Sequence, residues 1–384
     1  MKKLIIVRGP TLNKWEMQNY EPLANYFSIS AIGGKPKLSV NNEILMPISY
    51  CWSPAKYFMN SRIKLLIANA IWGSPYYLIG LKNKLKTFDI VNTVETFNPA
   101  TLAALNSKLK NPKQKLVITV WENVPFQNEG RLTIQNYIKK RALKEADHFI
   151  TTSERARESL IIEGAKPENI STVMMGINLN NFRPERKDQK LLKLFNLSPQ
   201  DFIVLTIARH TWEKGIHDLI LAFKKINLNK NCKLLIVGDG PYHDKLVLLT
   251  KKLKIFNNVR FVKNIDYKTI PKIHNLADLF VLSSIPVPGW QEQFGMVLIE
   301  SMACGKAVIS TLSGSIPEVI GNCGMLVPPA DSYELAKQLE VLYKDQKLRK
   351  NLGDESRKRA LELFDANKVS EKIKEVFLKV SNQN

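Results

Sequence analysis

Cysteine is scarce in this sequence, and the few cysteines are not arranged to share a metal ion. The 384 residues include four cysteines, and none of them forms a Cys-x-x-Cys pair. Cys232 and Cys304 lie in apolar segments, where we expect them to be buried, and the other two are Cys51 and Cys323. This pattern argues against a zinc site and against a disulfide framework, and it is typical of a reducing compartment. We therefore expect a cytoplasmic protein.

Long apolar runs are also lacking. The first one, Leu4–Val7, follows Lys2 and Lys3 and is too short for the core of a signal peptide. No apolar run approaches the roughly 20 residues that a helix needs to cross a bilayer. The sequence therefore predicts no transmembrane helix.

Acidic residues are outnumbered by basic ones. The chain has 35 Asp and Glu against 56 Lys and Arg, a formal net charge of +21, and the excess is spread over both halves. Such a balance suits anionic small ligands, an anionic membrane surface or nucleic acid, and a lysine-rich proteome would also produce it. No recognisable nucleic-acid module or concentrated basic and aromatic platform is present, so we do not expect a nucleic-acid partner.

One stretch keeps the membrane alternative open. Residues 55–86 are mostly of helical character, interrupted by Pro75, and mix six basic residues with Tyr57, Trp72 and other aromatics. A basic, aromatic, amphipathic segment can lie on an anionic bilayer. The competing and more common interpretation is a core helix with a solvated basic face. Peripheral contact with the inner face of the membrane is therefore retained as an alternative.

Several catalytic signatures are missing. There is no Gly-x-Ser-x-Gly elbow and no Walker loop, and no two of the five histidines have metal-ligand spacing. Gly238-Asp239-Gly240 lets backbone approach a ligand closely, but His243 occupies the place of the third glycine of a dinucleotide fingerprint. We therefore predict no metal and no NAD. His210 and His243 lie in loops where they could contact a ligand.

What the sequence has is a repeated alternation of short apolar runs and helical segments. A hydrophobic share of 45% and a charged share of 24% are those of a folded globular protein, and the length favours two domains. In the first half, the alternation predicts a parallel sheet covered by helices on both faces. The expected strands are 4–7, 26–33, 44–50, 89–94, 115–120, 148–152 and 172–175.

Ligands of such sheets gather at the carboxyl ends of the strands. Arg8, Glu95 and Glu122 stand at these ends. A solvated loop charge is the simpler explanation for each one alone. Two carboxylates at neighbouring strand ends, Glu95 and Glu122, make a catalytic pair a reasonable hypothesis.

After a polar join over residues 178–200, the alternation restarts. A strand at 202–208 is followed by a basic loop, a glycine and a helix from about Ile216. Arg209 and Lys214 lie in that loop, where two cations ahead of a helix N-terminus can converge on a diphosphate. A solvated loop is the alternative, but the order of strand, basic loop, glycine and helix favours phosphate binding.

Two glutamates mark the next candidate. Glu292 lies in a loop rich in proline and glycine, and Glu300 lies in a helix that we expect to start near Phe294. The loop carboxylate can project in front of the helix N-terminus while the other points sideways from the helix body. That arrangement suits a polyhydroxy ligand carrying phosphate. The alternative interpretation is that the two glutamates lie on a solvated loop and a surface helix without a ligand.

Taken together, these motifs resemble the retaining glycosyltransferases of family four, the group 1 glycosyltransferases. The matching segments over about 202–330 are Arg209…Lys214-Gly215, Gly238-Asp239-Gly240, Gln291-Glu292-x-Phe294-Gly295, Glu300-Ser301-Met302-Ala303-Cys304-Gly305 and Gly314-x-x-Pro317-Glu318. Gly176-Ile177-Asn178 through Pro184 also resembles that family's inter-domain junction. Over 1–175 only the alternation and weak strand-end motifs match.

The resemblance implies a GT-B fold, an α/β architecture of two Rossmann-like doubly wound parallel-sheet domains facing across a cleft. We expect an acceptor domain over 1–184, a donor domain over 185–364, and a C-terminal helix over 365–384 that packs back on the first domain. The implied activity is transfer of a hexose, with retention, from a nucleotide diphosphate sugar such as a UDP- or GDP-hexose to a sugar, glycan or lipid-linked acceptor. No cofactor and no metal are implied.

The resemblance also assigns roles to residues. Arg209 and Lys214 would bind the diphosphate, and Glu300 would accept hydrogen bonds from the ribose hydroxyls. Glu292, with the backbone amides of Phe294 and Gly295, would hold the donor sugar. Gly238 belongs to the same donor site.

The acceptor side departs from the family pattern. Where a histidine is frequent, this chain has Trp121-Glu122-Asn123, and the other strand-end motif is Val94-Glu95-Thr96. Carrying over a catalytic histidine would therefore be wrong, and Glu122, Glu95 and Glu292 are the candidate catalytic carboxylates. A nucleotide-sugar-binding scaffold or partner subunit that has lost transfer is the alternative function.

Overall fold

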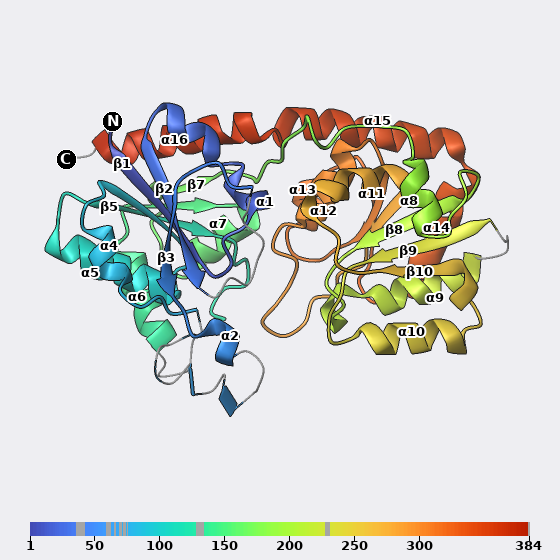
Figure 1. Ribbon diagram of the computed structural model, residues 1–384, viewed down its shortest axis with the longest axis horizontal. Helices are drawn as coiled ribbons and strands as arrows, with labels where there is room; N and C mark the ends of the chain where they lie inside the picture. The colour runs from blue at the N-terminus through green and yellow to red at the C-terminus, as the bar shows by residue number, and fades with distance from the viewer. Residues whose placement is uncertain are drawn as a thin grey trace. The chain divides into compact units, whose positions relative to one another are not determined.

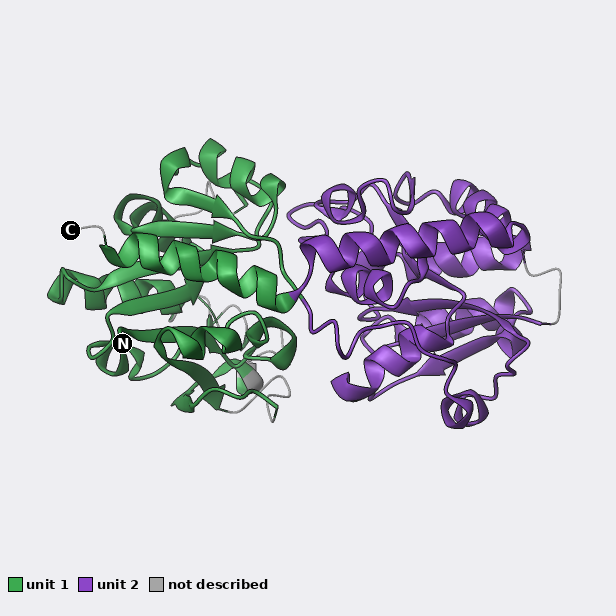
Figure 2. Ribbon diagram, turned by 90° about the horizontal axis from the view of Figure 1, so that it is seen from above, with its two compact units in different colours: residues 1–176, 366–384 green, residues 177–365 purple. Residues whose placement is uncertain are grey.

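The computed structural model describes residues 1–35, 43–58, 63–64, 67–68, 71, 74, 76–127, 134–226 and 231–382. The chain forms two compact units (Figure 2). Unit 1 is Met1–Gly176 together with Ala366–Asn384, and unit 2 is Ile177–Asp365. The division falls at residues 176 and 365, whereas the sequence suggested 184 and 364.

Unit 1 is built on a seven-stranded sheet in the order β3-β2-β1-β4-β5-β6-β7 (Figure 1). All pairings between these strands are parallel. The strands are β1 (Lys3–Gly9), β2 (Ser28–Lys35), β3 (Ile48–Trp52), β4 (Ile90–Val94), β5 (Lys115–Val120), β6 (His148–Thr151) and β7 (Ile170–Thr172). The helical segments are α1 (Lys14–Met17), η1 (Glu21–Asn25), α2 (Ala55–Phe58), α4 (Leu81–Leu85), α5 (Pro99–Lys110), α6 (Ile134–Glu145), α7 (Glu154–Ile162), η2 (Pro167–Asn169) and α16 (Ala366–Asn382).

The central strand β1 shows why a parallel sheet forms. Its side chains alternate between two apolar clusters, with Leu4 and Ile6 in one and Ile5 and Val7 in the other. Side chains on a strand point alternately to opposite faces, so β1 is buried on both faces and reads as a continuous apolar run. Helix α16 supplies apolar side chains to the cluster on the Leu4 face, so the end of the chain completes the core of unit 1.

Unit 2 has a six-stranded sheet in the order β10-β9-β8-β11-β12-β13, again with parallel pairings between the strands. The strands are β8 (Phe202–Ile207), β9 (Cys232–Val237), β10 (Val259–Val262), β11 (Leu279–Leu282), β12 (Ala307–Thr311) and β13 (Met325–Val327). The helical segments are α8 (Gln189–Leu194), η3 (Trp212–Lys214), α9 (Ile216–Ile226), α10 (His243–Lys252), η4 (Phe256–Asn258), η5 (Tyr267–Thr269), α11 (Ile270–Leu276), α12 (Met296–Ala303), α13 (Ile316–Ile320), α14 (Ser332–Lys344) and α15 (Gln346–Leu363).

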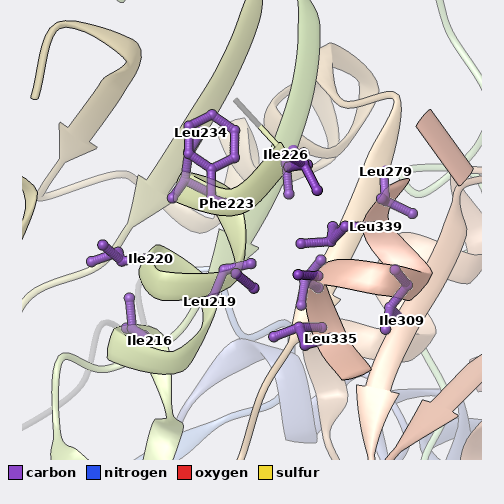
Figure 3. Close-up of a cluster of buried hydrophobic side chains, with 14 of the residues drawn as sticks. Ile216, Leu219, Ile220, Phe223, Ile226, Leu234, Leu279, Ile309, Leu335 and Leu339 are labelled. Carbon is purple, nitrogen blue, oxygen red and sulfur yellow. The ribbon is translucent and has the colours of Figure 1, made fainter. Parts of the chain in front are cut away.

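The core of unit 2 lies between this sheet and helices α9 and α14 (Figure 3). Helix α9 contributes Ile216, Leu219, Ile220 and Phe223, a spacing of three and four residues that places them on one side of the helix. The strand order reverses between β8 and β11, which pair directly. In open parallel sheets, ligands bind outside the carboxyl ends of the strands at such a reversal. The residues that follow β8 and β11 are therefore the first place to look for a site.

Several expectations from the sequence change in detail. The strands expected at 26–33, 44–50 and 172–175 are β2 (Ser28–Lys35), β3 (Ile48–Trp52) and β7 (Ile170–Thr172). The helix expected from Phe294 begins at Met296. Within the stretch 55–86, α2 and α4 are helical, but Trp72 and Pro75 lie outside the described residues. In the described part of the chain, no helix combines the length and the apolar character that crossing a membrane requires.

Candidate functional site

The carboxylate of Glu292 is the centre of the polar site beyond β8 and β11. Its Oε2 accepts a hydrogen bond from Lys214 Nζ at 2.7 Å and another from Ser284 Oγ at 2.6 Å. Glu292 is 7% exposed. Lys214 follows β8 and Ser284 follows β11, so the two strands at the reversal each supply one donor. Charge-assisted hydrogen bonds of this length fix the direction of a carboxylate.

Two further contacts hold this arrangement. The Lys214 ammonium lies 4.7 Å from the ring centroid of Trp290, a cation–π contact. The backbone of Glu292 is bound to the turn after β12, because Ser315 N donates to the Glu292 carbonyl at 3.0 Å. Gly314, with φ of +55°, lies so close that a Cβ there would be 1.9 Å from the same carbonyl oxygen. The loop that carries Glu292 is therefore a packed part of unit 2 and not the solvated loop of the alternative interpretation.

Arg209 is placed differently from Lys214. Its side chain is 69% exposed, and its Nη2 lies 3.4 Å from Glu213 Oε1. A surface pair at that distance contributes little to stability. Arg209 therefore has a side chain that is free to reorient toward an anionic ligand, whereas Lys214 is already fixed.

Glu300 is buried on helix α12 and is held by two neighbours that the sequence did not suggest. Tyr267 donates to Glu300 Oε1 at 3.0 Å, and His274 Nε2 lies 3.4 Å from Oε2. Burial lowers the pKa of His274, so its ring stays neutral at neutral pH. An ionised carboxylate has about four acceptor positions, so a ribose hydroxyl can bind Glu300 as a third partner. Its predicted role in ribose binding stays a prediction.

Gly238 is required for close backbone packing within unit 2. With φ of +137°, a Cβ on it would lie 2.0 Å from the carbonyl oxygen of Ala208. The glycine therefore lets the loops after β8 and β9 touch. Phe294 is fully buried, and Gly295 has φ of +83° just before α12. The donor-binding roles predicted for Gly238, Phe294 and Gly295 are not tested by these contacts.

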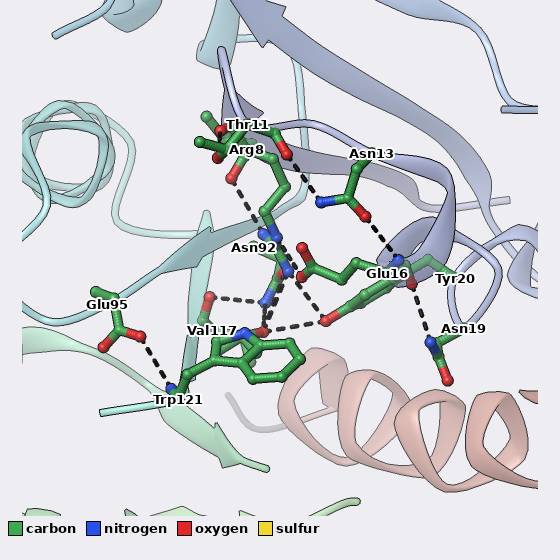
Figure 4. A network of polar contacts seen from close by, with 12 residues as sticks. Arg8, Thr11, Asn13, Glu16, Asn19, Tyr20, Asn92, Glu95, Val117 and Trp121 are labelled. Atoms are coloured by element: carbon green, nitrogen blue, oxygen red, sulfur yellow. Dashed lines mark hydrogen bonds and ion pairs between the residues drawn. The ribbon is translucent and has the colours of Figure 1, made fainter. Parts of the chain in front are cut away.

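In unit 1, Arg8 is not the solvated loop charge that the sequence suggested. It is buried at the end of β1, where its guanidinium donates to Glu16 at 2.6 Å, Tyr20 at 3.0 Å and Asn92 at 2.9 Å (Figure 4). Thr119 of β5 joins the same network through Tyr20 Oη at 3.1 Å. The network ties the carboxyl ends of β1, β4 and β5 together, so Arg8 positions the strand ends from which Glu95 and Glu122 emerge.

Glu95 combines a strained backbone with an unusual carboxyl group. Its φ is +62°, which is uncommon for a residue other than glycine, and such residues concentrate at functional sites. Trp121 N donates to Glu95 Oε1 at 3.0 Å, while Oε2 is buried and has no hydrogen-bond partner among the described residues (Figure 4). Burial and the neighbouring Glu122 charge raise the pKa of Glu95 to about 8. The carboxyl is therefore mostly protonated at neutral pH.

Glu122 lies beside it and differs in environment. The amides of Asn123 and Val124 donate to its Oε1 at 3.0 and 2.9 Å. Burial nevertheless raises its pKa above the ordinary value. The structure thus brings the two predicted carboxylates into electrostatic contact at neighbouring strand ends, and the pKa of each is raised.

The sequence missed several residues around the predicted side chains of unit 2. Ser284, Trp290, Tyr267 and His274 contact these side chains but match no motif by themselves. The one available signal was position, because Ser284 lies two residues beyond the end of β11 at the reversal. Cys51, Cys232 and Cys304 are buried, as expected for the latter two.

The two parallel-sheet units, each with polar groups beyond the carboxyl ends of its strands, have the GT-B fold. The structure of Alr3699/HepE from Anabaena in complex with UDP-glucose superposes with a TM-score of 0.78 at 19% identity, covering 99% of this chain and 100% of that one. Sucrose-phosphate synthase from Thermosynechococcus elongatus gives a TM-score of 0.75 at 18% identity, with 99% of each chain covered. Both likenesses therefore show the GT-B fold of this molecule.

The chain belongs to the group 1 glycosyl transferases. The sequence profile of that family matches residues 188–359. The N-acetyl-alpha-D-glucosaminyl L-malate synthase of Bacillus anthracis is 33% identical over 320 residues, 81% of this chain and 81% of that protein. The capsular polysaccharide biosynthesis glycosyltransferase CapM of Staphylococcus aureus is 28% identical over 255 residues, 62% of this chain and 63% of that protein.

Proposed function

We propose that this glycosyltransferase moves a hexose from a nucleotide diphosphate sugar to a sugar, glycan or lipid-linked acceptor, with retention of anomeric configuration. The observation that carries the proposal is the fixed carboxylate of Glu292 between Lys214 and Ser284 at the strand reversal of unit 2. A buried, oriented carboxylate accepts hydroxyl hydrogen bonds, and an adjacent ammonium stabilises a phosphate. One end of the site therefore suits a sugar and the other a diphosphate.

The leaving group of such a donor is a nucleoside diphosphate, on which negative charge develops as the glycosidic bond breaks. Lys214 and the exposed guanidinium of Arg209 supply two positive charges to it, and the amides ahead of α12 supply oriented dipoles. These groups provide the stabilisation that a metal supplies in other transferases, so we propose that transfer needs no metal and no cofactor. Two donors bind Oε2 of Glu292 and lower its nucleophilicity, so this carboxylate is proposed to orient the donor sugar and not to attack it.

Glu300 is proposed to bind the ribose of the donor. Its carboxylate is buried on α12 and already oriented by Tyr267 and His274. Both partners leave acceptor positions on the carboxylate. Gly238, Phe294 and Gly295 are proposed to contribute backbone to the same donor site.

The acceptor is proposed to bind at Glu95 and Glu122. A protonated Glu95 donates a hydrogen bond, which suits an acceptor hydroxyl or ring oxygen, and Glu122 provides a second carboxyl group. Retention by front-face attack lets the leaving phosphate take the acceptor proton, so neither glutamate has to be a strong base. The protonated state of Glu95 at neutral pH supports this assignment.

We also propose that unit 1 makes peripheral contact with an anionic membrane surface, where a lipid-linked acceptor would lie. The described residues from 52 to 79 include exposed large apolar side chains at Trp52, Tyr57, Ile67, Ile71 and Ile79. Trp52 and Tyr57 stack with ring centroids 6.1 Å apart. Lys84 donates to the Tyr50 carbonyl at 3.0 Å, which brings a cation to the end of β3 beside them. Apolar and basic side chains together are typical of surfaces that lie on anionic lipid.

The donor assignment is tested with a thermal-shift screen of nucleotide sugars, followed by titration of the best one. A donor at 100 times its dissociation constant adds about 2.7 kcal/mol of stability. Lys214→Ala is expected to weaken that donor by about 1.5–3 kcal/mol, the scale of a charge-assisted hydrogen bond. Lys337→Ala, which removes an exposed lysine from α14, is the matched control and is expected to change nothing. Equal donor affinity in both variants would remove Lys214 from the phosphate site.

A further inference from the structure

Two histidines and an aspartate meet where the loops after β8 and β9 touch. His210 Nδ1 and His243 Nδ1 are 3.0 Å apart, and ligand atoms of His210, Asp239 and His243 all lie within 4.8 Å of one another. In the described part of the chain, this is the one group of three His, Cys, Asp or Glu side chains that are close enough to hold one ion. His210 and His243 are 33 residues apart in the sequence, so rules of local ligand spacing did not detect them.

The backbone holds the group in place. His210 N donates to the Asp239 carbonyl at 2.8 Å, and Tyr242 N donates to the His210 carbonyl at 2.9 Å. The backbone N–H and the carbonyl of His210 are thus both bound to the loop after β9. His210 is fully buried, so its imidazole is fixed, while His243 opens helix α10 and is partly exposed. The group therefore consists of one rigid ligand and two that can adjust.

Asp239 already has one cationic partner in the structure. Lys263 Nζ lies 3.0 Å from Asp239 Oδ1 and occupies one position that a cation could take.

We propose that His210, Asp239 and His243 form a binding site for one divalent transition-metal ion of the Zn²⁺ type. Two nitrogen ligands at 2.0–2.1 Å from a tetrahedral ion are about 3.3 Å apart, close to the separation of the two Nδ1 atoms. The rings are nearly parallel, at 6°, and the contact between the two Nδ1 atoms is itself a hydrogen bond. Metal binding therefore requires His243 to turn and the shared hydrogen to move from Nδ1 to Nε2. Imidazole and carboxylate together favour Zn²⁺, Ni²⁺ or Cu²⁺ over Mg²⁺, which prefers oxygen ligands alone.

The ion takes no part in sugar transfer, and this inference does not rest on the proposed function. Its effect is mechanical, because it crosslinks the loop that carries Arg209 to the loop that carries Gly238. We expect the bound ion to raise the melting temperature and to reduce hydrogen exchange in both loops.

The experiment is a titration of the chelator-treated full-length chain with Zn²⁺ alone, by calorimetry and by equilibrium dialysis. One tight equivalent is expected. His243→Asn keeps a hydrogen-bonding atom near the position of Nδ1, and Asp239→Asn keeps the shape of the side chain, so both variants are expected to fold and to bind Zn²⁺ at least about tenfold more weakly. Asp244→Asn removes an exposed carboxylate next to His243 and is the control, with unchanged affinity expected.

Lys263→Gln provides the opposite test. Removing the ammonium frees Asp239, so Zn²⁺ is expected to bind more tightly, whereas a lysine unrelated to the site would leave affinity unchanged. Melting temperatures measured with chelator present show that each variant is folded before its affinity is compared. No tight equivalent, or wild-type affinity in either His243→Asn or Asp239→Asn, would mean that Zn²⁺ binds elsewhere or adventitiously and would overturn the proposal. Failure of Lys263→Gln to tighten binding would overturn Asp239 as a ligand.

Discussion

At the scale of single residues, Glu95 has the most unusual backbone and carboxyl environment of the candidate residues in unit 1. Its positive φ directs the side chain away from the course of β4, and its carboxyl accepts the Trp121 amide with one oxygen while the other stays buried. Desolvation and the nearby Glu122 charge both disfavour ionisation. A group with these properties is a hydrogen-bond donor at neutral pH, in contrast to an ordinary surface glutamate.

The pH dependence of transfer tests this property. If protonated Glu95 donates to the acceptor, kcat/KM falls as the pH rises through about 8, because ionisation removes the donor. Glu95→Gln keeps a donor that does not ionise, so it is expected to retain activity within about tenfold at pH 7 and to lose the alkaline decline. The measurement is a pH profile of kcat/KM for both proteins.

Glu122→Gln is the companion variant. Its charge is the second cause of the raised pKa of Glu95, so its removal is expected to move the alkaline decline to lower pH. A rate that instead rises through pH 8 and disappears in Glu95→Gln would make Glu95 a general base, contrary to the proposal.

Some residues of the candidate sites could be predicted from the sequence and others could not. The places of Lys214 and Glu292 beyond the strand ends could be predicted from sequence, because each lies close to a strand end or a helix start, and their binding roles stay predictions. Arg8 could not, because its partners Glu16, Tyr20 and Asn92 come together only when three strand ends meet. The sequence also did not predict that His210 and His243 contact each other, since that contact depends on two loops touching.

At the scale of secondary structure, apolar runs predicted the central strands because strands buried on both faces are apolar at most positions, although β4 includes the polar residues Asn92 and Thr93. The end of β7 was misplaced because Val173 and Met175 are buried although they lie beyond the last ladder pairing at Thr172. Burial without strand pairing gives the same sequence pattern as a strand.

Helix α16 offers a test of how the end of the chain stabilises unit 1. Phe377 is fully buried and packs edge-on against Phe27, with ring centroids 6.1 Å apart. Phe377→Ala creates a cavity in that core and is expected to cost about 3–5 kcal/mol. The neighbouring Leu378 is 40% exposed, so Leu378→Ala is expected to cost well under half as much.

Hydrogen exchange is the measurement of choice, because two units need not unfold together. Faster exchange in β1, β4 and β5 with unchanged exchange in unit 2 is expected for Phe377→Ala. Equal behaviour of the two variants would mean that α16 does not contribute to the core of unit 1.

At the scale of the whole molecule, the two units share one sheet topology and carry different polar residues at the ends of their strands. Both sheets reverse strand order beside their first strand, and in both the polar groups follow the carboxyl ends of the strands. The sequence predicted this repetition, since the alternation of strands and helices restarts after residue 200. It placed the boundary eight residues late, because the polar segment after Ile177 looks like a linker although unit 2 already includes it.

The net charge of +21 is a property of the whole molecule, and its role is tested by vesicle binding. We expect the protein to co-sediment with vesicles that contain anionic lipid and not with neutral ones, and to be released as salt screens the lysines. Tyr57→Ala removes an exposed ring from the apolar surface of unit 1 and is expected to weaken binding severalfold, whereas Tyr333→Ala removes an even more exposed ring from unit 2 and serves as its match. If both variants sediment like the parent protein, charge alone drives any binding and residues 52–79 are not the contact surface. If the protein stays in the supernatant with both kinds of vesicle, it does not bind membranes, and the positive charge would then act only on anionic substrates.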